Sequence, residues 1–320
     1  QMCIRDRDKF LYVLKNKVVV ALDISSSFFI IPLKEEDRHK TAFWLNDLAF
    51  EFNVCVMGLK SSPYHLKKFV DKVYAQGEIE NYAKKLSIEE QAILPKHYDM
   101  EIKRFLISYF DDNFVYTDTH EQLYVTFKLF LMIARDARIK FSIEKTKLFT
   151  TKIKVLGYAF DTKETVLQLE ELKASGIMNM KKPSSLFELH SRLASFQYQS
   201  IFLPYLKHVL YPLHFMLRKR IFTWGEIEET SWQLAKTLAT LNLKLTIPDA
   251  CDNLVLTTDA SKIAASACLF REKDGKLELV AVNSKYFAVT DLNKCSYMLE
   301  SIALGYGLKV FSSYILNCEG

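Results

Sequence analysis

The sequence lacks several features that would assign it to a class at once. Its six cysteines include no CxxC pair, which excludes the common zinc and thioredoxin-like motifs. No apolar run approaches the ~18 residues that span a bilayer, and no secretory signal is recognisable. Internal repeats and low-complexity tracts are also missing. We therefore expect an intracellular, cytoplasmic protein with reduced thiols and no membrane partner.

The composition that is present is typical of a folded protein. Hydrophobic residues make up 49% and aromatic residues 13% of the 320 positions, enough for two or three domains. The 43 basic and 38 acidic residues give a net charge of +5. This mild excess permits a nucleic-acid partner without requiring one, because a local basic patch matters more than the sum.

Two adjacent acids, Asp111 and Asp112, stand between two short apolar runs. β-Branched and aromatic residues on both sides of a polar break predict a β-hairpin. A further acid, Asp23, ends the apolar run Val18–Leu22. We expect the three acids to meet and to hold two divalent metal ions, as in enzymes that transfer phosphoryl groups. Taken alone, an Asp-Asp pair is also what an ordinary solvated turn contains.

Apolar periodicity predicts alternating strands and helices in the first half of the chain. Strands are expected at 18–23, 28–33, 41–45, 50–54, 139–141 and 153–160, and helices at 62–74 and 120–137. The segment from Gly77 to Met100 is polar and has no clear period. These elements predict an α+β domain, an antiparallel sheet with helices on one face.

Helical signals dominate from about residue 170 to Pro248. Helices are expected at 203–217 and 226–243, and Ser184 or Ser185 is suited to cap the helix after Pro183. Strands at 254–258, 264–270 and 277–282 then precede a helix at 294–311. The last part of the chain therefore reads as a separate α/β domain.

Six motifs in a fixed order resemble the reverse transcriptase of long-terminal-repeat retroelements of the Ty3-like type. They are Leu22–Phe28 continued by Ile31–Leu33 and Lys40–Phe43, Met57–Pro63, Tyr109–Asp112, Lys140–Lys145, Val155–Tyr158 and Phe222–Trp224. The similarity is collinear from about residue 9 to the end. It implies an RNA-directed DNA polymerase whose partners are an RNA or DNA template, a primer and a deoxynucleoside triphosphate.

The resemblance also implies a role for each motif residue. Asp23 and Asp111 would bind two Mg²⁺ ions directly, with Asp112 in support and with Mn²⁺ as an alternative metal, and Lys145 would act as general acid. Phe28 would exclude a ribose 2′-hydroxyl. The nucleotide and template would meet Met57, Gly58, Lys60 and Tyr109, and the primer grip would be Val155, Leu156, Gly157 and Tyr158. Each has a plainer alternative: Phe28 as a core residue, Lys145 as a solvated lysine, and the glycines as turn residues.

A second acidic site is implied by Asp259 and Glu300. Their surroundings, Thr257–Ser261 and Tyr297–Leu304, resemble two metal-binding motifs of the ribonuclease H of retroelements. That family uses four acidic positions, and only these two are matched before Gly320. We therefore expect inefficient RNA cleavage by this chain.

The resemblance divides the chain into four parts. They are a non-native leader at 1–7, a polymerase palm with a remnant of the fingers at 8–168, thumb or connection helices at 169–248, and a truncated ribonuclease H-like domain at 249–320. Two residues depart from the family: Ser27 stands in place of Gly, and Met57 in place of Phe or Gln. The spacing between Pro63 and Tyr109 is also long for the family, and we assign the surplus to a surface insertion within 77–100.

Two functions follow as alternatives. The first is a polymerase that in its parent element works inside a virus-like particle. The second is a catalytically inactive or co-opted remnant that binds nucleic acid or assembles with partners. Intact Asp23, Asp111 and Asp112 favour the first. The oligomeric state is not specified by the sequence.

Overall fold

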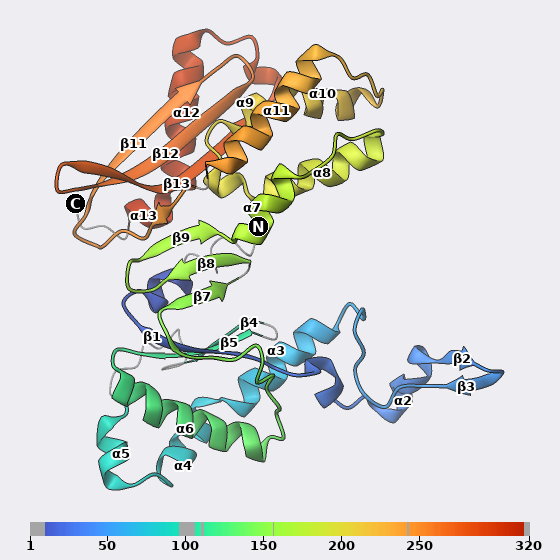
Figure 1. Ribbon diagram of the computed structural model, residues 1–320, viewed down its shortest axis with the longest axis vertical. Coiled ribbons are helices and arrows are strands. Elements are labelled where there is room, and N and C mark those ends of the chain that lie inside the picture. Colours follow the sequence, from blue (N-terminus) through green and yellow to red (C-terminus); the bar gives the residue numbers. More distant parts are fainter. Residues whose placement is uncertain (1–9, 96–105, 110–111, 156, 242, 317–320) are drawn as a thin grey trace. The chain divides into compact units, whose positions relative to one another are not determined.

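The computed structural model describes residues 10–95, 106–109, 112–155, 157–241 and 243–316. The chain separates into two compact units, residues 1–153 and 154–320. Both units mix helices with antiparallel sheets, which confirms the α+β class (Figure 1). No helix within the described ranges is long and apolar enough to cross a membrane. The predicted leader at 1–7 lies outside those ranges, and the predicted division into palm, thumb and ribonuclease H-like parts stays a prediction.

A four-stranded sheet forms the centre of the first unit. Its order is β4 (Leu106–Tyr109), β5 (Asp112–Thr117), β1 (Val18–Asp23) and β6 (Lys147–Thr150). Three consecutive residues of β1, Val18, Val19 and Val20, are buried. Since side chains alternate between the two faces of a strand, both faces of β1 are covered at this point. The predicted hairpin is confirmed as β4 paired with β5.

Helices pack on the sheet of the first unit. They are α3 (Ser62–Val73), α4 (Gln76–Ala83), α5 (Ile88–Ile93) and α6 (His120–Asp136). The core joins Leu66 of α3 and Phe130 of α6 to residues of β1. Thr119 caps α6 by accepting a hydrogen bond from the backbone N–H of Gln122. The predicted helices at 62–74 and 120–137 are thus confirmed to within one residue.

A smaller subdomain carries α2 (Glu35–Arg38) and a two-stranded hairpin of β2 (Phe43–Leu45) and β3 (Leu48–Phe50). The hairpin turn places Asn46 and Asp47 at positive φ. The two strands predicted here therefore exist, but they are shorter than expected and lie closer together in the sequence.

The segment 77–100, which we assigned to a surface insertion, is helical in its described part, and the insertion itself stays a prediction. Residues 76–83 and 88–93 form α4 and α5, and Ile79 and Leu86 are buried in the core. The Lys128 ammonium of α6 lies 2.6 Å from a carboxylate oxygen of Glu90 of α5. Helices this short bury only one or two side chains each, so they leave no readable period in the sequence.

Three other predicted strands differ from the structure. Residues 27–30 form a 3₁₀-helix that follows a left-handed Ser26, so no strand covers 28–33. The segment 139–141 contributes one isolated bridge, Ile24 to Phe141. The strand expected at 153–160 is two strands divided at Gly157, whose φ of +78° turns the chain.

The second unit begins with a four-stranded sheet and a group of helices. The strands are β7 (Lys152–Val155), β8 (Tyr158–Asp161), β9 (Val166–Leu169) and β10 (Leu245–Thr246), in the order β10-β9-β8-β7. The helices are α7 (Glu171–Met178), α8 (Leu186–Tyr198), α9 (Leu206–Val209), α10 (Tyr211–Lys219) and α11 (Glu226–Thr240). Ser185 caps α8, as one of two predicted candidates. Phe196 meets Trp232 edge-on in their shared core.

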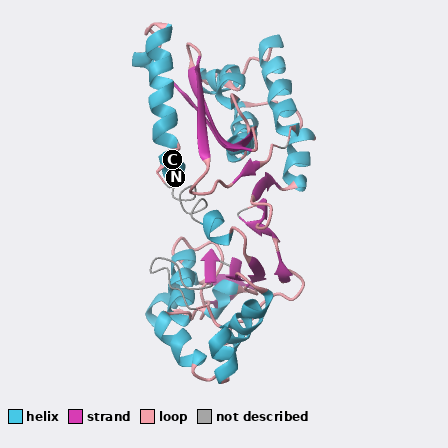
Figure 2. Cartoon of the chain, turned by 90° about the vertical axis from the view of Figure 1, so that its left-hand side faces the viewer, coloured by secondary structure: helices cyan, strands magenta, loops and turns pink. Residues whose placement is uncertain are grey.

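A three-stranded sheet completes the second unit. It consists of β11 (Asn253–Ala260), β12 (Ala264–Lys273) and β13 (Lys276–Tyr286), followed by α12 (Ser296–Val310) and α13 (Ser312–Ile315). Helix α12 packs on one face, where Leu299 and Ala303 join its core. Helix α9 meets the other face through His208, whose ring nitrogen lies 3.3 Å from the Ser266 hydroxyl. Figure 2 shows these strands with helices on both sides.

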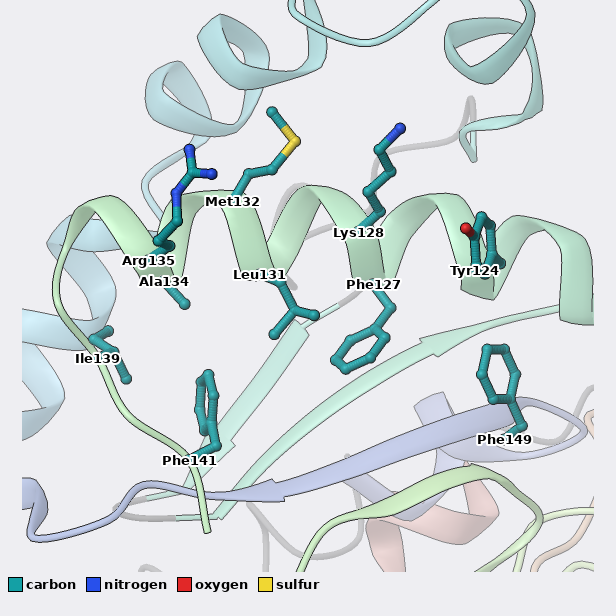
Figure 3. A pocket seen from close by; sticks show the side chains of 10 residues that line it. All are labelled: Tyr124, Phe127, Lys128, Leu131, Met132, Ala134, Arg135, Ile139, Phe141 and Phe149. Carbon is teal, nitrogen blue, oxygen red and sulfur yellow. The ribbon is translucent and has the colours of Figure 1, made fainter. Parts of the chain in front are cut away.

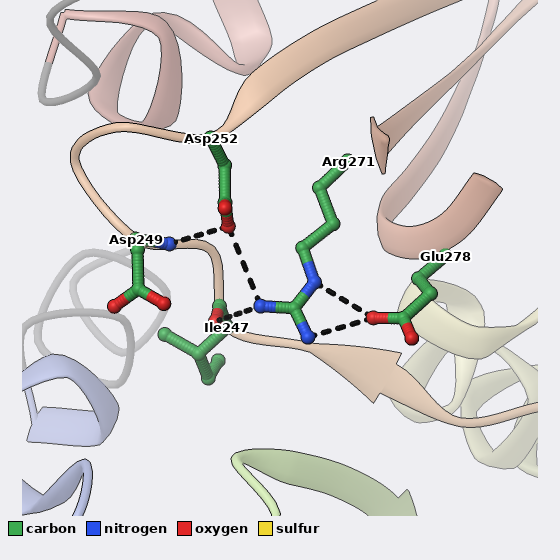
Figure 4. Close-up of polar contacts among 5 residues, drawn as sticks. All are labelled: Ile247, Asp249, Asp252, Arg271 and Glu278. Carbon is green, nitrogen blue, oxygen red and sulfur yellow. Dashed lines mark hydrogen bonds and ion pairs between the residues drawn. The ribbon is translucent and has the colours of Figure 1, made fainter. Parts of the chain in front are cut away.

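A buried arginine ties β12 to its surroundings. The Arg271 guanidinium donates to Glu278 on β13 at 2.7 Å, to Asp252 at 3.3 Å and to the carbonyl oxygen of Ile247 at 3.4 Å (Figure 4). Asp252 also accepts the backbone N–H of Asp249. The network joins the segment before β11 to the β12–β13 hairpin.

Acid should destabilise the second unit through His214 of α10, which faces the ring of Tyr286. Burial, and then the cations Lys207 and Arg218, lower the pKa of His214 to about 4. The unfolded chain binds this proton below about pH 6.5, so stability is fully present above that pH and falls as the pH approaches 4. The loss of stability is at most about 3 kcal/mol.

Urea unfolding between pH 7 and pH 4 measures this loss of stability. His214→Gln should flatten the dependence, and an unchanged slope would refute the assignment.

Candidate active site

Asp23 and Asp112 lie directly opposite each other in the sheet. Asp23 ends β1, Asp112 begins β5, and the two are paired residues in the antiparallel register. Directly opposed residues in such a pair have Cβ atoms about 5 Å apart and side chains on the same face. Two of the three predicted metal ligands are therefore brought together at one end of the sheet. Asp111 lies outside the described residues.

The segment after α6 carries Lys145 to this end of the sheet. Backbone hydrogen bonds join Ser25 to Lys140 and Ser142 to Asp23, so the segment runs beside the end of β1. The backbone N–H and the hydroxyl of Thr146 both bond the carbonyl oxygen of Ser142 and close a tight turn. The Lys145 ammonium then lies 3.1 Å from a carboxylate oxygen of Asp23.

The ion pair between Lys145 and Asp23 shows that this end of the sheet attracts a cation. The Asp23 side chain is 24% exposed and that of Lys145 is 67% exposed, so the pair contributes little to stability. A positive charge already rests on the carboxylate, however, and oxygen ligands of this kind are those that Mg²⁺ prefers. The donor set therefore fits a divalent cation as far as the described residues show.

Phe28 lies five residues after Asp23 and belongs to the 3₁₀-helix of residues 27–30. Its ring is half-buried and packs against the core of the first unit together with Ile30 and Ile31. Part of the ring is thus a core contact and part remains accessible. The predicted role in sugar selection stays a prediction.

The loop before α3 presents the predicted nucleotide contacts to solvent. Met57 is 66% exposed, and Lys60 is exposed. Gly58 has φ +91°, a conformation that requires glycine, with open space beside it. The Ser62 hydroxyl donates to the carbonyl oxygen of Val56 and holds the loop against the helix start. Of Tyr109, the structure describes the backbone, which pairs with Asp112.

The predicted primer grip is the turn between β7 and β8. The side chains of Val155 and Tyr158 are buried, so neither of them is presented to solvent. Tyr158 stacks on Tyr198 at 5.3 Å between ring centres, and its hydroxyl donates to the Tyr198 carbonyl oxygen. At Gly157, a Cβ would collide with the Lys173 ammonium and the Tyr198 hydroxyl. Leu156 lies outside the described residues.

Lys173 and Tyr198 were not found by sequence reasoning. Lys173 lies 16 residues and Tyr198 lies 41 residues after Gly157, each on a helix that follows the turn. Neither residue belongs to a predicted motif. The sequence holds no local signal that would bring them to this glycine, because the contact depends on how α7 and α8 pack.

The other predicted acids do not converge in the same way. Leu256 and Thr258 face α12, because both approach Gly307 of that helix. Asp259 therefore points to the opposite face, toward Ser266 and the α9 side. Glu300 lies on α12 and is exposed. The described residues include no cluster of three or more His, Cys, Asp or Glu that could hold a metal. The ribonuclease H site stays a prediction.

A cavity of about 680 Å³ lies beneath α6, and its lining includes neither Asp23 nor Asp112. Figure 3 shows Phe127 and Leu131 of α6 pointing toward Phe141 and Phe149, which lie on either side of Lys145 in the sequence. The lining is mostly apolar, so the cavity is unsuited to a phosphate group. It does not coincide with the predicted catalytic residues.

Two family models match the sequence. Residues 4–160 match the reverse transcriptase (RNA-dependent DNA polymerase), and residues 224–319 match the RNase H-like domain found in reverse transcriptase. The first match covers nearly all of the first unit, and the second match covers the later part of the second unit.

Curated relatives and solved structures agree with these matches. The genome polyprotein of Petunia vein clearing virus is 24% identical over 314 residues, 96% of this chain and 13% of that polyprotein. The retrovirus-related Pol polyprotein from transposon opus of Drosophila melanogaster is 24% identical over 311 residues, 93% of this chain and 28% of that polyprotein. The structure of the foamy viral protease-reverse transcriptase in complex with RNA/DNA hybrid has a TM-score of 0.71 at 19% identity, covering 95% of this chain and 38% of that one. The chain thus spans less than half of each of these proteins.

Proposed function

We propose, from the premise that this chain belongs to the reverse transcriptases that carry an RNase H-like domain, that it extends a primer 3′-hydroxyl with deoxynucleotides along an RNA or DNA template. The observation that supports this most is the direct pairing of Asp23 with Asp112 across β1 and β5. If the acids of the hairpin were only part of a solvated turn, there would be no reason for Asp23, at the end of another strand, to lie opposite Asp112.

Asp23, Asp111 and Asp112 would hold Mg²⁺, with Mn²⁺ as a substitute. Bound there, divalent ions would supply charge that neutralises the triphosphate and would lower the pKa of the attacking hydroxyl. The chain itself fixes the two described carboxylates, because Asp23 and Asp112 lie within the ladder of a sheet whose central strand is buried on both faces. Rigid placement of this kind is what in-line transfer requires.

Template bases would select the nucleotide, and the protein would contact mainly the sugar–phosphate backbone. Such binding depends strongly on salt and weakly on sequence. Extension of a labelled primer on an RNA template with Mg²⁺ and deoxynucleotides tests the proposal. Template-dependent extension is the expected result, and its failure while duplex binding persists would favour the alternative of a binding module.

Lys145 should affect both the rate and the metal requirement. Lys145→Gln removes a proton donor for the pyrophosphate leaving group, so the maximal rate should fall about 10²-fold. It also removes the cation that competes for Asp23, so the Mg²⁺ concentration for half-maximal rate should decrease. Single-turnover extension across a Mg²⁺ series measures both.

Lys147→Gln is the matched control, since Lys147 is an exposed lysine two positions further along the chain. It should leave the rate and the Mg²⁺ requirement unchanged. If Lys145→Gln behaves like this control, Lys145 is a solvated loop residue without a part in the chemistry.

A further inference from the structure

A lysine outside every predicted motif lies against the β7–β8 turn. Lys173 extends from the first turn of α7, and its ammonium occupies the space beside Gly157 where any other residue would carry its Cβ. Gly157 therefore does more than provide a positive φ. It leaves room for a cation to reach the backbone of the turn.

The groups that hold this ammonium are neutral. Its nitrogen lies 3.2 Å from the Tyr198 hydroxyl and 4.8 Å from the centre of the same ring. Tyr198 is itself fixed by stacking on Tyr158. The Gln199 side-chain amide donates to the backbone carbonyl oxygen of Lys173 at 3.4 Å. Two helix ends and one strand thus position a single charge.

No carboxylate neutralises Lys173 within the described part of the chain. Glu170, three residues before Lys173, is engaged by the ammonium of Lys154. A lysine ammonium has three donors, and the Tyr198 hydroxyl accepts only one of them. A half-buried cation that is held by neutral groups and retains unused donors is suited to bind an anion.

We infer that Lys173 binds a backbone phosphate of the primer–template duplex at the β7–β8 turn. The inference rests on the proposed function, because the turn is the predicted primer grip. The contact would position the duplex without reading its sequence, since phosphates carry no base identity. Lys173 is therefore a positioning residue and takes no part in the chemical step.

The salt dependence of duplex binding tests the inference without turnover. Binding of a fluorescent RNA/DNA hybrid to the full chain is measured across a KCl series, with no divalent metal or deoxynucleotide present. Lys173→Gln should reduce the slope of log affinity against log salt by about one and weaken binding about tenfold at 0.1 M salt. Lys173→Arg should retain the slope.

Two controls separate charge from structure. Lys163→Gln removes an exposed lysine from the β8–β9 turn of the same sheet and should change nothing. Tyr198→Phe removes the hydroxyl partner but keeps the cation, so it should leave the slope unchanged. Should Lys173→Gln fail to fold, the wild-type chain answers the question by acetylation footprinting: the duplex should protect Lys173 and leave Lys163 reactive.

The outcomes distinguish this inference from the proposed function. An unchanged slope in Lys173→Gln, or equal acetylation of Lys173 with and without duplex, overturns the inference while the polymerase assignment stands. If the wild-type chain binds no duplex at any salt concentration, the proposed function fails with it.

Discussion

Asparagine at position 23 should abolish primer extension and leave the fold intact. The Asp23→Asn side chain keeps its shape at the end of β1 but loses the charge that faces Asp112. Metal-assisted stabilisation of the transition state is worth several kcal/mol, and each 1.4 kcal/mol corresponds to a factor of ten, so the rate should fall by about 10³-fold or more. Single-turnover extension with a labelled primer measures the loss.

The matched control for this prediction is Asp118→Asn. Asp118 follows β5 at the other end of the strand, where it pairs with Lys17. Removing its charge should not change the rate of extension. Hybrid affinity measured without metal should be the same in wild type and in Asp23→Asn. Full activity of Asp23→Asn would refute the assignment of the paired acids.

Removal of the Arg271 side chain should strongly destabilise the second unit. Arg271→Ala would leave Asp252, whose side chain is 15% exposed, without its charged partner, and Glu278 without a hydrogen bond and an ion pair. Breaking a buried ion pair on one side costs about 3–5 kcal/mol. We expect about 3 kcal/mol, because the Glu278 side chain is 41% exposed and keeps contact with water. Urea unfolding followed by circular dichroism measures the difference.

Two further variants test the cause of this loss. Lys273→Ala, two residues further along β12 and exposed, should change stability by less than about 0.5 kcal/mol. Arg271→Ala combined with Asp252→Asn should be less destabilised than the sum of the two single changes, because the second removes the charge that the first leaves unpaired. Strict additivity would show that the loss does not come from the unpaired charge of Asp252.

The long elements were predictable because each has a pattern of its own. The β-branched run of β1, the paired apolar runs of β4 and β5, and the apolar periodicity of α6 each specify one element locally. The predictions that differ from the structure concern segments whose secondary structure is determined by tertiary contacts. Residues 76–93 became two helices because Ile79 and Leu86 reach the core that α6 provides. Residues 27–30 form a 3₁₀-helix, which directly follows Ser26 in a left-handed conformation.

The candidate site was predictable in its acids and not in its supporting contacts. Asp23 and Asp112 lie at strand ends, and the sequence predicted that these acids meet, although it did not give the register that pairs them. The Lys145 contact to Asp23 joins residues 122 positions apart. The resemblance to the family indicated Lys145, but nothing in the sequence between Asp23 and Lys145 predicts that the two side chains meet. Lys173 beside Gly157 had no sequence signal at all, because the approach of α7 to the turn depends on the packing of a whole unit.

Direct observation of metal binding tests the central claim most closely. Mn²⁺ binding is followed by electron paramagnetic resonance in complexes with a dideoxy-terminated primer, template and the next nucleotide, so that no turnover occurs. Wild type and Asp118→Asn should bind Mn²⁺ alike, and Asp23→Asn and Asp112→Asn should each lose the same sites. Unchanged Mn²⁺ binding in both of these variants would contradict the account, because the two opposed carboxylates would then not share the ions.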